Sequence, residues 1–312
     1  MTATATAGDA LPMVLTEVEV EAAEDLSPSF VRLTLAGTGL EHVGVDGPLW
    51  DQRFKLIVPH ESGGITSVHD ADESWLGTWM DRPEHERGHM RTYTIRALVG
   101  SGAARRLILD VVRHPGASGP GADWACSAGV GDRAVALLPR AGHHFGGIEF
   151  TAPAGAELLL VGDESAVPAV HAILEQLPGD ARGAAFLEVA DAADRLPVRH
   201  PAGVSLTWVV RGEAPLGAGL HAAVLDHLGA AATPTAEEPE EVDPDLWETP
   251  TWSSSGESLD GDAPTRGELW AWIAGESGVV TGLRRHLVKE LGIDRRQVAF
   301  MGYWRRGVAM KS

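Results

Sequence analysis

The first half of the chain is a series of short segments in which apolar and polar residues alternate or β-branched residues cluster, separated by stretches rich in Gly, Pro and Asp. Alternation with a period of two is typical of strands that bury one face. The expected strands are residues 14–20, 30–35, 53–58, 91–97, 107–112 and 134–138. Because these strands are short and show no helical periodicity, we expect a small antiparallel β-barrel of the Greek-key type.

After residue 153 the pattern changes to strands that alternate with helices. Strands are expected at residues 157–161, 184–189, 204–210, 269–274 and 297–302, and helices at 165–177, 220–228 and 281–291. This alternation indicates a parallel sheet with helices on both faces, the doubly wound α/β plan. Because 312 residues exceed the size at which one core comfortably grows, we expect two domains, residues 11–152 and 153–312.

The formal net charge of −19 is unevenly distributed along the chain. Ten acidic residues and no Lys or Arg lie between residues 232 and 262, whereas residues 266–312 contain nine basic and four acidic residues. An acidic protein repels nucleic acid, but its basic part can attract an anionic ligand. We interpret residues 232–264, rich in Pro, Ser, Glu and Asp, as a solvated, disordered insertion, parts of which Trp247 and Trp252 could pin down.

The sequence argues against several classes of protein. No apolar run approaches the roughly 20 residues that span a bilayer, and residues 1–10 lack the features of a signal peptide. The single cysteine, Cys126, excludes a disulfide framework and suits a reducing compartment. Two histidine pairs have no third ligand at a known spacing, so no metal site is expected: His143 with His144, and His85 with His89. We therefore expect a soluble cytoplasmic protein, and nothing demands more than a monomer.

The segment Arg91-Thr92-Tyr93-Thr94-Ile95-Arg96 carries the most chemistry. On a strand, Arg91 and Tyr93 share one face and Thr94 lies on the other. An arginine pairs with phosphate, a tyrosine lies against a planar ring, and a threonine hydrogen-bonds a ring heteroatom. The combination fits a flavin nucleotide, although a barrel strand with ordinary exposed arginines would show the same residues.

A second chemical segment follows at the end of the next strand. It consists of Asp110-Val111-Val112-Arg113-His114 and a glycine-rich turn, residues 115–125, that enters a short helix. Backbone N–H groups of such a turn, with a helix N-terminus behind it, can hold a pyrophosphate. His114 and Trp124 could flank the same ligand, although loops between barrel strands often have this composition.

In this order, residues 91–96, 110–114 and 119–125 resemble the FAD-binding half of the siderophore-interacting proteins, also called ferric-siderophore reductases. Further segments match the family's later motifs in order and spacing: residues 160–169, 272–276, 283–287 and 302–307. The resemblance covers nearly the whole chain, apart from the first ten residues and the acidic insertion. It implies a ferredoxin reductase-like fold and FAD-dependent reduction of a ferric siderophore, which releases Fe(II). The implied electron donor is NAD(P)H or a reduced carrier such as ferredoxin.

The resemblance also implies roles for individual residues. The flavin and its ribityl phosphate would be held by Arg91, Tyr93 and Thr94. The remaining FAD-binding residues, on the diphosphate and adenosine side, would be Asp110, Val112, His114, Ala122, Trp124 and Ala125. A docked nicotinamide nucleotide would be bordered by Gly162, Asp163, Glu164, Ser165, Gly275 and Glu276. The alternative for residues 162–165 is a plain strand-to-helix turn with an N-cap, and no G-x-G-x-x-G follows a strand to hold a dinucleotide tightly.

Three cations are candidates for binding an anionic ferric siderophore. Lys55 lies on a strand that, by the resemblance, faces the substrate, and Arg305 and Arg306 lie near the C-terminus. Residues 138–144 depart from the family's Gly-Pro-Arg-Gly-like turn, which puts contacts there in doubt. Two other functions stay open: a general NAD(P)H-flavin oxidoreductase with another acceptor, and a non-catalytic siderophore-binding protein.

Overall fold

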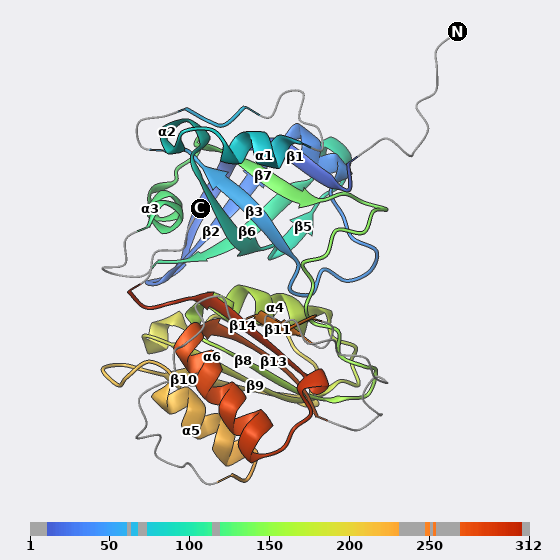
Figure 1. Ribbon diagram of the computed structural model, residues 1–312, viewed down its shortest axis with the longest axis vertical. Coiled ribbons are helices and arrows are strands. Elements are labelled where there is room, and N and C mark those ends of the chain that lie inside the picture. Colours follow the sequence, from blue (N-terminus) through green and yellow to red (C-terminus); the bar gives the residue numbers. More distant parts are fainter. Residues whose placement is uncertain are drawn as a thin grey trace. The chain divides into compact units, whose positions relative to one another are not determined.

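The computed structural model describes residues 11–60, 64–67, 74–113, 119–230, 247–249, 252–253 and 269–307. These residues form two compact units (Figure 1). The first contains the described residues up to 25 together with 31–147, and the second contains residues 26–30 together with those from 148 onwards. Each unit is built around one seven-stranded sheet.

The sheet of the first unit is antiparallel in the pairs β1–β7, β3–β4, β3–β7 and β5–β6. Its strands follow the order β4-β3-β7-β1-β2-β6-β5. Their bounds are β1 Met13–Ser27, β2 Phe30–Ala36, β3 Arg53–Val58, β4 His89–Thr94, β5 Ala97–Val99, β6 Arg106–Val112 and β7 Arg133–Pro139. All six predicted strand regions are therefore strands, and the fourth divides into β4 and β5.

The two strands at the ends of this order, β4 and β5, are joined by only Ile95 and Arg96. The Ile95 amide donates to the Gln52 carbonyl, which precedes β3, over 2.8 Å. The Arg96 amide donates to the Ile108 carbonyl of β6 over 3.0 Å. A flat sheet could not be linked in this way, so the sheet curls until its two ends meet.

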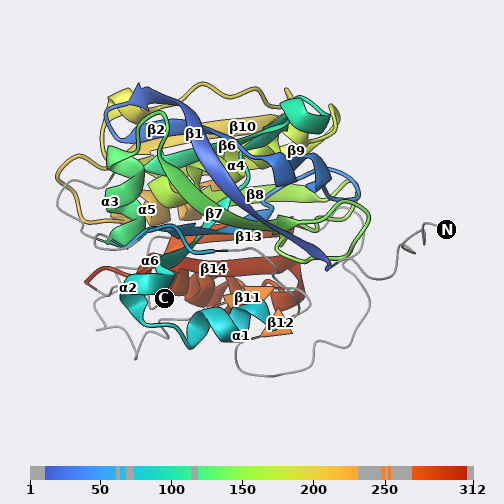
Figure 2. The same cartoon turned by 90° about the horizontal axis from the view of Figure 1, so that it is seen from above.

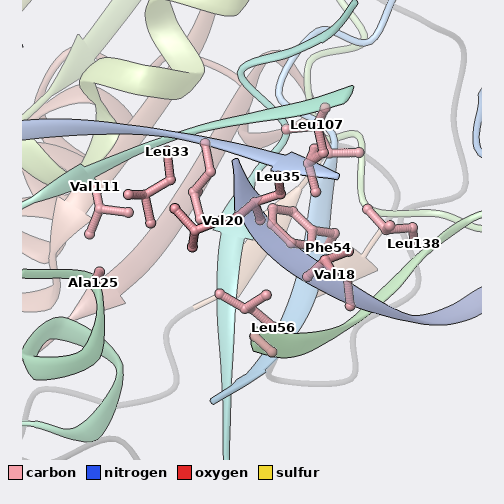
Figure 3. Close-up of a cluster of buried hydrophobic side chains, with 14 of the residues drawn as sticks. Val18, Val20, Leu33, Leu35, Phe54, Leu56, Leu107, Val111, Ala125 and Leu138 are labelled. Carbon is pink, nitrogen blue, oxygen red and sulfur yellow. The ribbon is translucent and has the colours of Figure 1, made fainter. Parts of the chain in front are cut away.

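The interior of this curled sheet is apolar and mostly aliphatic (Figure 3). Alternate residues of β1, Val14, Val18 and Val20, are buried there, while the glutamates between them face outward. Phe54 and Leu56 of β3 point into the same cluster. Each such side chain contributes about 1.5–3 kcal/mol when fully buried. The predicted alternation of apolar and polar residues therefore forms the core of this unit.

The outer face of β3 and β7 carries a second apolar cluster. Helix α1 (Trp75–Met80) packs Trp75 and Trp79 against Ile57, Val135 and Leu137. The Trp79 indole donates to the carbonyl of Arg87, at the end of the short helix α2 (Glu84–Arg87), over 2.9 Å. Neither helix was predicted from the sequence.

The second sheet follows the order β10-β9-β8-β13-β14-β11-β12. Its first five strands are parallel and its last two pair antiparallel. Their bounds are β8 Glu157–Gly162, β9 Arg182–Val189, β10 Val204–Val210, β11 Trp247–Thr249, β12 Trp252–Ser253, β13 Leu269–Glu276 and β14 Val298–Trp304. The predicted parallel sheet is present with all five of its expected strands.

Helices cover both faces of this parallel sheet (Figure 1). On one face, α5 (Ala218–His227) and α6 (Ser277–Arg284) bury Leu220, Val224 and Leu283 against the strands. On the other face lies α4 (Val167–Gln176), which is buried from Val167 to Leu174. The fold class predicted from the sequence, an antiparallel barrel followed by a doubly wound α/β unit, is thus confirmed. No helix in the described part of the chain is both long and apolar enough to cross a membrane.

Most of the acidic segment predicted to be disordered lies outside the described residues. Its described parts, β11 and β12, form a small hairpin on the edge of β14 (Figure 2). Trp247 pairs with Met301 and stacks on Tyr303 with ring centroids 6.1 Å apart. The backbone of Trp252 is part of this hairpin.

Candidate functional site

In the first unit, the two predicted FAD-binding segments come together. Helix α3 (Pro120–Ser127) packs against β4, and Gly121 makes the closest approach. A Cβ atom on Gly121 would lie 2.6 Å from Cγ of Arg91 and 2.9 Å from the Tyr93 hydroxyl oxygen. Only a glycine fits this position without displacing those side chains. The arginine, the tyrosine and the start of a helix therefore share one location.

Tyr93 lies at the rim of the barrel core. Its ring is 6.4 Å from that of Phe54, its partner across the β3–β4 ladder, and it packs against the core cluster. Burial raises the pKa of Tyr93 to about 12, an effect that Arg91 opposes and Cys126 adds to. The phenol is therefore neutral at physiological pH and can both pack against a ring and donate a hydrogen bond.

Lys55 and Thr92 lie on the opposite face of the same ladder. The Lys55 ammonium donates to Oγ1 of Thr92 over 2.6 Å, in keeping with their pairing across the strands. Burial, together with the nearby charge of Arg53, lowers the pKa of Lys55. Thr94, also on this face, is buried. β4 is the last strand in the sheet order, so a ligand at the end of this strand can meet side chains from both faces.

Asp110, expected among the FAD-binding residues, is engaged by arginines of the chain itself. Its buried carboxylate accepts two hydrogen bonds from Arg32, at 2.7 and 2.8 Å, and lies 3.5 Å from Arg96. This arrangement ties β6 to β2 and to the joint between β4 and β5. The Asp110 carboxylate is therefore held by arginines of the chain itself.

The remaining FAD-side residues lie on or near α3. Ala125 is buried in the barrel core and Trp124 packs against that core. Val112 is buried at the end of β6. His114 and the side chain of Ala122 lie outside the described residues.

The residues of this location fit an FAD. Arg91 supplies a fixed positive charge for a phosphate, and Tyr93 supplies a neutral ring. Because Gly121 has no side chain, the backbone of α3 lies directly against the side chains of Arg91 and Tyr93. At the α3 N-terminus the Gly119 amide donates to the Asp123 carboxylate over 3.0 Å, so the amides available to a diphosphate are those that follow Pro120.

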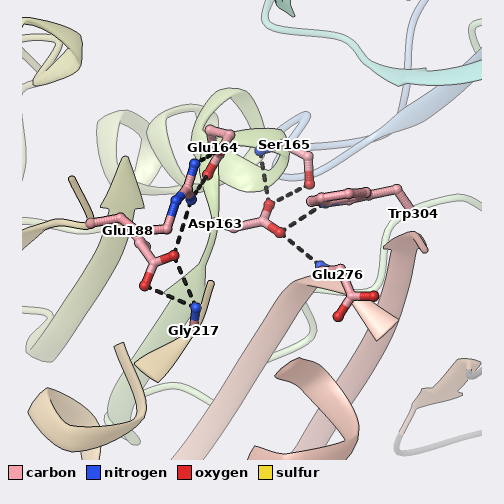
Figure 4. Close-up of polar contacts among 8 residues, drawn as sticks. Asp163, Glu164, Ser165, Glu188, Gly217, Glu276 and Trp304 are labelled. Carbon is pink, nitrogen blue, oxygen red and sulfur yellow. Dashed lines mark hydrogen bonds and ion pairs between the residues drawn. The ribbon is translucent and has the colours of Figure 1, made fainter. Parts of the chain in front are cut away.

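In the second unit, the predicted nicotinamide-side residues also come together. They lie at the C-terminal ends of β8 and β13, the neighbouring strands between which the sheet order reverses. The Asp163 carboxylate accepts hydrogen bonds from three residues of this region (Figure 4). Its Oδ1 accepts from the Ser165 amide at 2.9 Å and hydroxyl at 2.5 Å. Its Oδ2 accepts from the Glu276 amide at 2.7 Å and the Trp304 indole at 2.8 Å.

The absence of a side chain at Gly275 leaves room for the Asp163 carboxylate. This glycine adopts φ +148°, and a Cβ atom there would lie 2.7 Å from Oδ2 of Asp163. Gly162 has a similar role, since its Cβ atom would lie 2.5 Å from that of Ala166. Burial, aided by the neighbouring charge of Glu164, raises the pKa of Asp163 to about 6.

Glu164 belongs to a second buried network (Figure 4). Arg211 donates to both of its carboxylate oxygens, at 3.0 and 2.9 Å, and also to Glu188 at 3.1 Å. Glu188 in turn accepts from the Gly217 amide, which precedes α5, at 3.0 Å. These bonds raise the pKa of Arg211. The network joins the ends of β8, β9 and β10.

Glu276 caps α6 from the end of β13. One of its oxygens accepts from the amides of Gly278 at 2.7 Å and Val279 at 3.0 Å. The other accepts from the Arg306 amide at 3.2 Å. The Ser277 hydroxyl donates to the Trp304 carbonyl at 3.0 Å. The segment that carries the predicted cations Arg305 and Arg306 is thereby attached to the end of β13.

Sequence reasoning missed several residues of these sites, among them Gly121, Glu188, Arg211 and Trp304. Glu188 had a signal, because a glutamate inside the apolar run 184–189 requires a buried partner. Gly121 and Trp304 lie within segments that carried the family resemblance, but neither was assigned a contact. Nothing near Arg211 in the sequence identifies its two partners.

Comparison with known proteins agrees with this arrangement. The family model described as "Siderophore-interacting FAD-binding domain" matches residues 19–143, and the model "Siderophore-interacting protein" matches residues 155–307. An uncharacterised protein of Mycobacterium tuberculosis is 32% identical over 296 residues, covering 93% of this chain and 89% of its own. The ferric vibriobactin reductase ViuB of Vibrio cholerae is 28% identical, covering 90% of this chain and 86% of its own.

Solved structures of similar fold include another protein of siderophore metabolism. A siderophore utilization protein from T. fusca matches with a TM-score of 0.67 and 28% identity, covering 97% of both chains. The ferredoxin reductase of carbazole 1,9a-dioxygenase matches in fold, with a TM-score of 0.56 and 16% identity over 94% of this chain and 68% of its own. This chain therefore belongs to the siderophore-interacting protein family of FAD-binding, ferredoxin reductase-like flavoproteins.

Proposed function

We propose that this protein is an FAD-dependent reductase that delivers electrons to ferric iron bound by a siderophore and so releases Fe(II). Its electrons come from NAD(P)H or from a reduced carrier such as ferredoxin. The observation that carries the proposal is the convergence of Arg91, Tyr93 and Gly121 where α3 meets β4. Membership of the siderophore-interacting family and the similarity to ferric vibriobactin reductase support it.

On this proposal the chain holds the cofactor and leaves the redox chemistry to it. Arg91 neutralises a phosphate of FAD, and Tyr93 lies against the isoalloxazine ring. Thr94 or the backbone of β4 hydrogen-bonds a ring heteroatom. Val112, Trp124 and Ala125 shape the diphosphate and adenosine side. When bound, FAD supplies the means to accept a hydride and to release electrons singly.

The substrate side relies on positive charge. Oxygen ligands of a siderophore hold hard Fe(III) far more strongly than Fe(II), so reduction leads to release. Many such complexes are anions, and we propose that Lys55, Arg305 and Arg306 attract and orient them. Arg306 is exposed, and its backbone is fixed by Glu276.

We further propose that the protein works as a monomer in the cytoplasm. Its single cysteine, Cys126, is exposed on α3 and would stay reduced there. Partial desolvation by the surrounding residues raises the pKa of this exposed thiol, which keeps it protonated and unreactive at neutral pH.

An anaerobic reduction assay tests the proposal. The purified protein is loaded with FAD and reduced with NADH, NADPH or ferredoxin in separate samples, and ferric siderophores are added with a ferrous-iron trap. We expect the flavin to reoxidise as trapped Fe(II) appears in a ratio of two Fe(II) per flavin. A reduced flavin that stays reduced with every ferric siderophore would contradict the proposal.

Two controls separate the rival functions. A general flavin oxidoreductase would turn over free flavin faster than ferric siderophore under the same conditions. A non-catalytic binding protein would remain colourless with excess FAD yet still bind the siderophore. Either of these results would contradict our proposal.

A further inference from the structure

The C-terminal ends of β8 and β13, where the sheet order reverses, are where an open α/β sheet normally binds its ligand. In dinucleotide-binding sheets the diphosphate lies there against free amides at the start of a helix, and glycines let it approach closely. The corresponding amides and glycine in this protein already have partners.

Carboxylates of the chain itself occupy the amides. Asp163 accepts from the amides of Ser165 and Glu276, at 2.9 and 2.7 Å. Glu276 accepts from the two amides at the start of α6, and Glu188 accepts from the Gly217 amide that precedes α5. These three carboxylate residues are 1%, 8% and 0% exposed respectively, so each is fixed inside the fold.

The glycine that could admit a phosphate admits a carboxylate instead. Gly275 leaves a space in which a Cβ atom would lie 2.7 Å from Oδ2 of Asp163. The Asp163 carboxylate thus fills the space that Gly275 leaves at the ends of β8 and β13. A diphosphate entering here would meet Asp163 and Glu276 at short range, and like charges repel strongly in a poorly solvated site.

The cation inside these networks, Arg211, offers no compensation, and the cations on the segment held by Glu276 are Arg305 and the solvent-exposed Arg306. Arg211 is shared between Glu164 and Glu188, two buried carboxylates, at 2.9 to 3.1 Å. Its single charge is already exceeded by theirs. The buried carboxylates at these strand ends therefore disfavour the diphosphate of NAD(P)H.

We infer that the second unit recognises no dinucleotide through its diphosphate, and that a nicotinamide donor is used through its nicotinamide mononucleotide half alone. This inference rests on the proposed function only in taking a nicotinamide compound as a donor. It predicts that the adenosine diphosphate half of NADH or NADPH contributes little to kcat/KM, so the 2′-phosphate of NADPH makes little difference.

Two measurements on the FAD-loaded wild-type protein test the inference. In the first, anaerobic flavin reduction is followed with NADH, NADPH and reduced nicotinamide mononucleotide. We expect their kcat/KM values to agree within about tenfold, which corresponds to 1.4 kcal/mol. A larger advantage for either dinucleotide would overturn the inference.

The second measurement is direct binding of ADP-ribose, which has the diphosphate but no nicotinamide. FAD loading fills the adenosine side of the flavin site beforehand. We expect a Kd above about 1 mM by calorimetry, and a Kd below this value would overturn the inference. This result decides the matter even where no nicotinamide compound reduces the flavin.

Failure of the proposed function would be visible separately. Protein reduced chemically with dithionite, then freed of excess reductant, is mixed with ferric siderophore and the ferrous trap. Absence of Fe(II) in this sample would refute ferric-siderophore reduction while leaving the ADP-ribose and mononucleotide results intact.

Discussion

Gly121 and Tyr93 lie so close together that a single added methyl group would come within 2.9 Å of the phenol oxygen. The two residues belong to α3 and β4, which are separated by more than twenty residues of chain. Their contact is what brings the glycine-rich turn to the arginine and tyrosine of the strand. The proposed flavin site depends on this contact.

Substitution Gly121→Ala should weaken FAD binding. Alanine favours the helix by about 0.5–1 kcal/mol, but the overlap with Arg91 and Tyr93 costs about 1–3 kcal/mol. We expect a higher Kd for FAD, measured by quenching of flavin fluorescence. The matched control is Gly179→Ala, where a Cβ atom meets nothing within 4 Å. Equal Kd values for the two variants would remove Gly121 from the site.

Substitution Lys55→Ala should raise KM for ferric siderophore and leave the flavin content unchanged. Loss of a charge-assisted contact costs about 1.5–3 kcal/mol, or roughly tenfold or more in KM. Thr92→Val is the control, because it removes the acceptor of the 2.6 Å hydrogen bond but keeps the ammonium. An unaltered KM in Lys55→Ala would exclude Lys55 from the substrate site.

The KM for ferric siderophore should also depend on pH through Lys55. Burial and Arg53 lower the pKa of this group below the usual 10.5. The ammonium therefore loses its proton earlier than an exposed lysine as the pH rises. We expect KM to increase on the alkaline side, and this increase should disappear in Lys55→Ala.

Asp163 should make stability depend on pH. Its pKa is about 6 in the folded protein against an ordinary 3.8, so between these values the folded state holds a proton that the unfolded chain releases. Its contribution to the free energy of unfolding is largest below the lower value and falls by about 3 kcal/mol as the pH rises through the higher one. Urea unfolding of wild type and Asp163→Asn across this range should show the difference, and parallel pH profiles would contradict it.

Substitution Arg211→Met should be strongly destabilising. It leaves the buried carboxylates of Glu164 and Glu188 without their cation, at a cost of about 3–5 kcal/mol. Adding Glu164→Gln and Glu188→Gln should recover part of this loss. Arg182→Met, at an exposed position of β9, should change stability by less than about 0.5 kcal/mol. Thermal unfolding of the variants checks all three expectations, and equal losses for the two arginines would be the contrary result.

The elements that could be predicted from the sequence are those in which apolar and polar residues alternate because one face is buried. The strand expected at residues 14–20 extends to Ser27 in β1, because the second half of this strand is exposed and carries no apolar alternation. Helix α1 was missed because its six residues, which include Gly77, are too few to show a period. Helix α6 starts four residues earlier than expected, since its cap is the side chain of Glu276 rather than a usual Ser, Thr, Asp or Asn.

The site was predictable as far as its motifs are continuous in sequence. Arg91 and Tyr93 follow from strand alternation, and the turn at Gly162 follows from the junction of strand and helix. The link between Glu188 and Arg211, 23 residues apart, depends on the register of parallel strands. The link between Asp163 and Trp304 spans 141 residues and depends on the order of strands in the sheet. Local patterns contain neither kind of information.

The short joint of Ile95 and Arg96 gives β4 a second role. The strand proposed to hold the flavin is also the strand at which the sheet closes on itself. A ligand that binds β4 therefore also stabilises the closed sheet. At a hundredfold excess over its Kd, the ligand raises the free energy of unfolding by about 2.7 kcal/mol. Flavin-free molecules would lack this stabilisation of the strand at which the sheet closes.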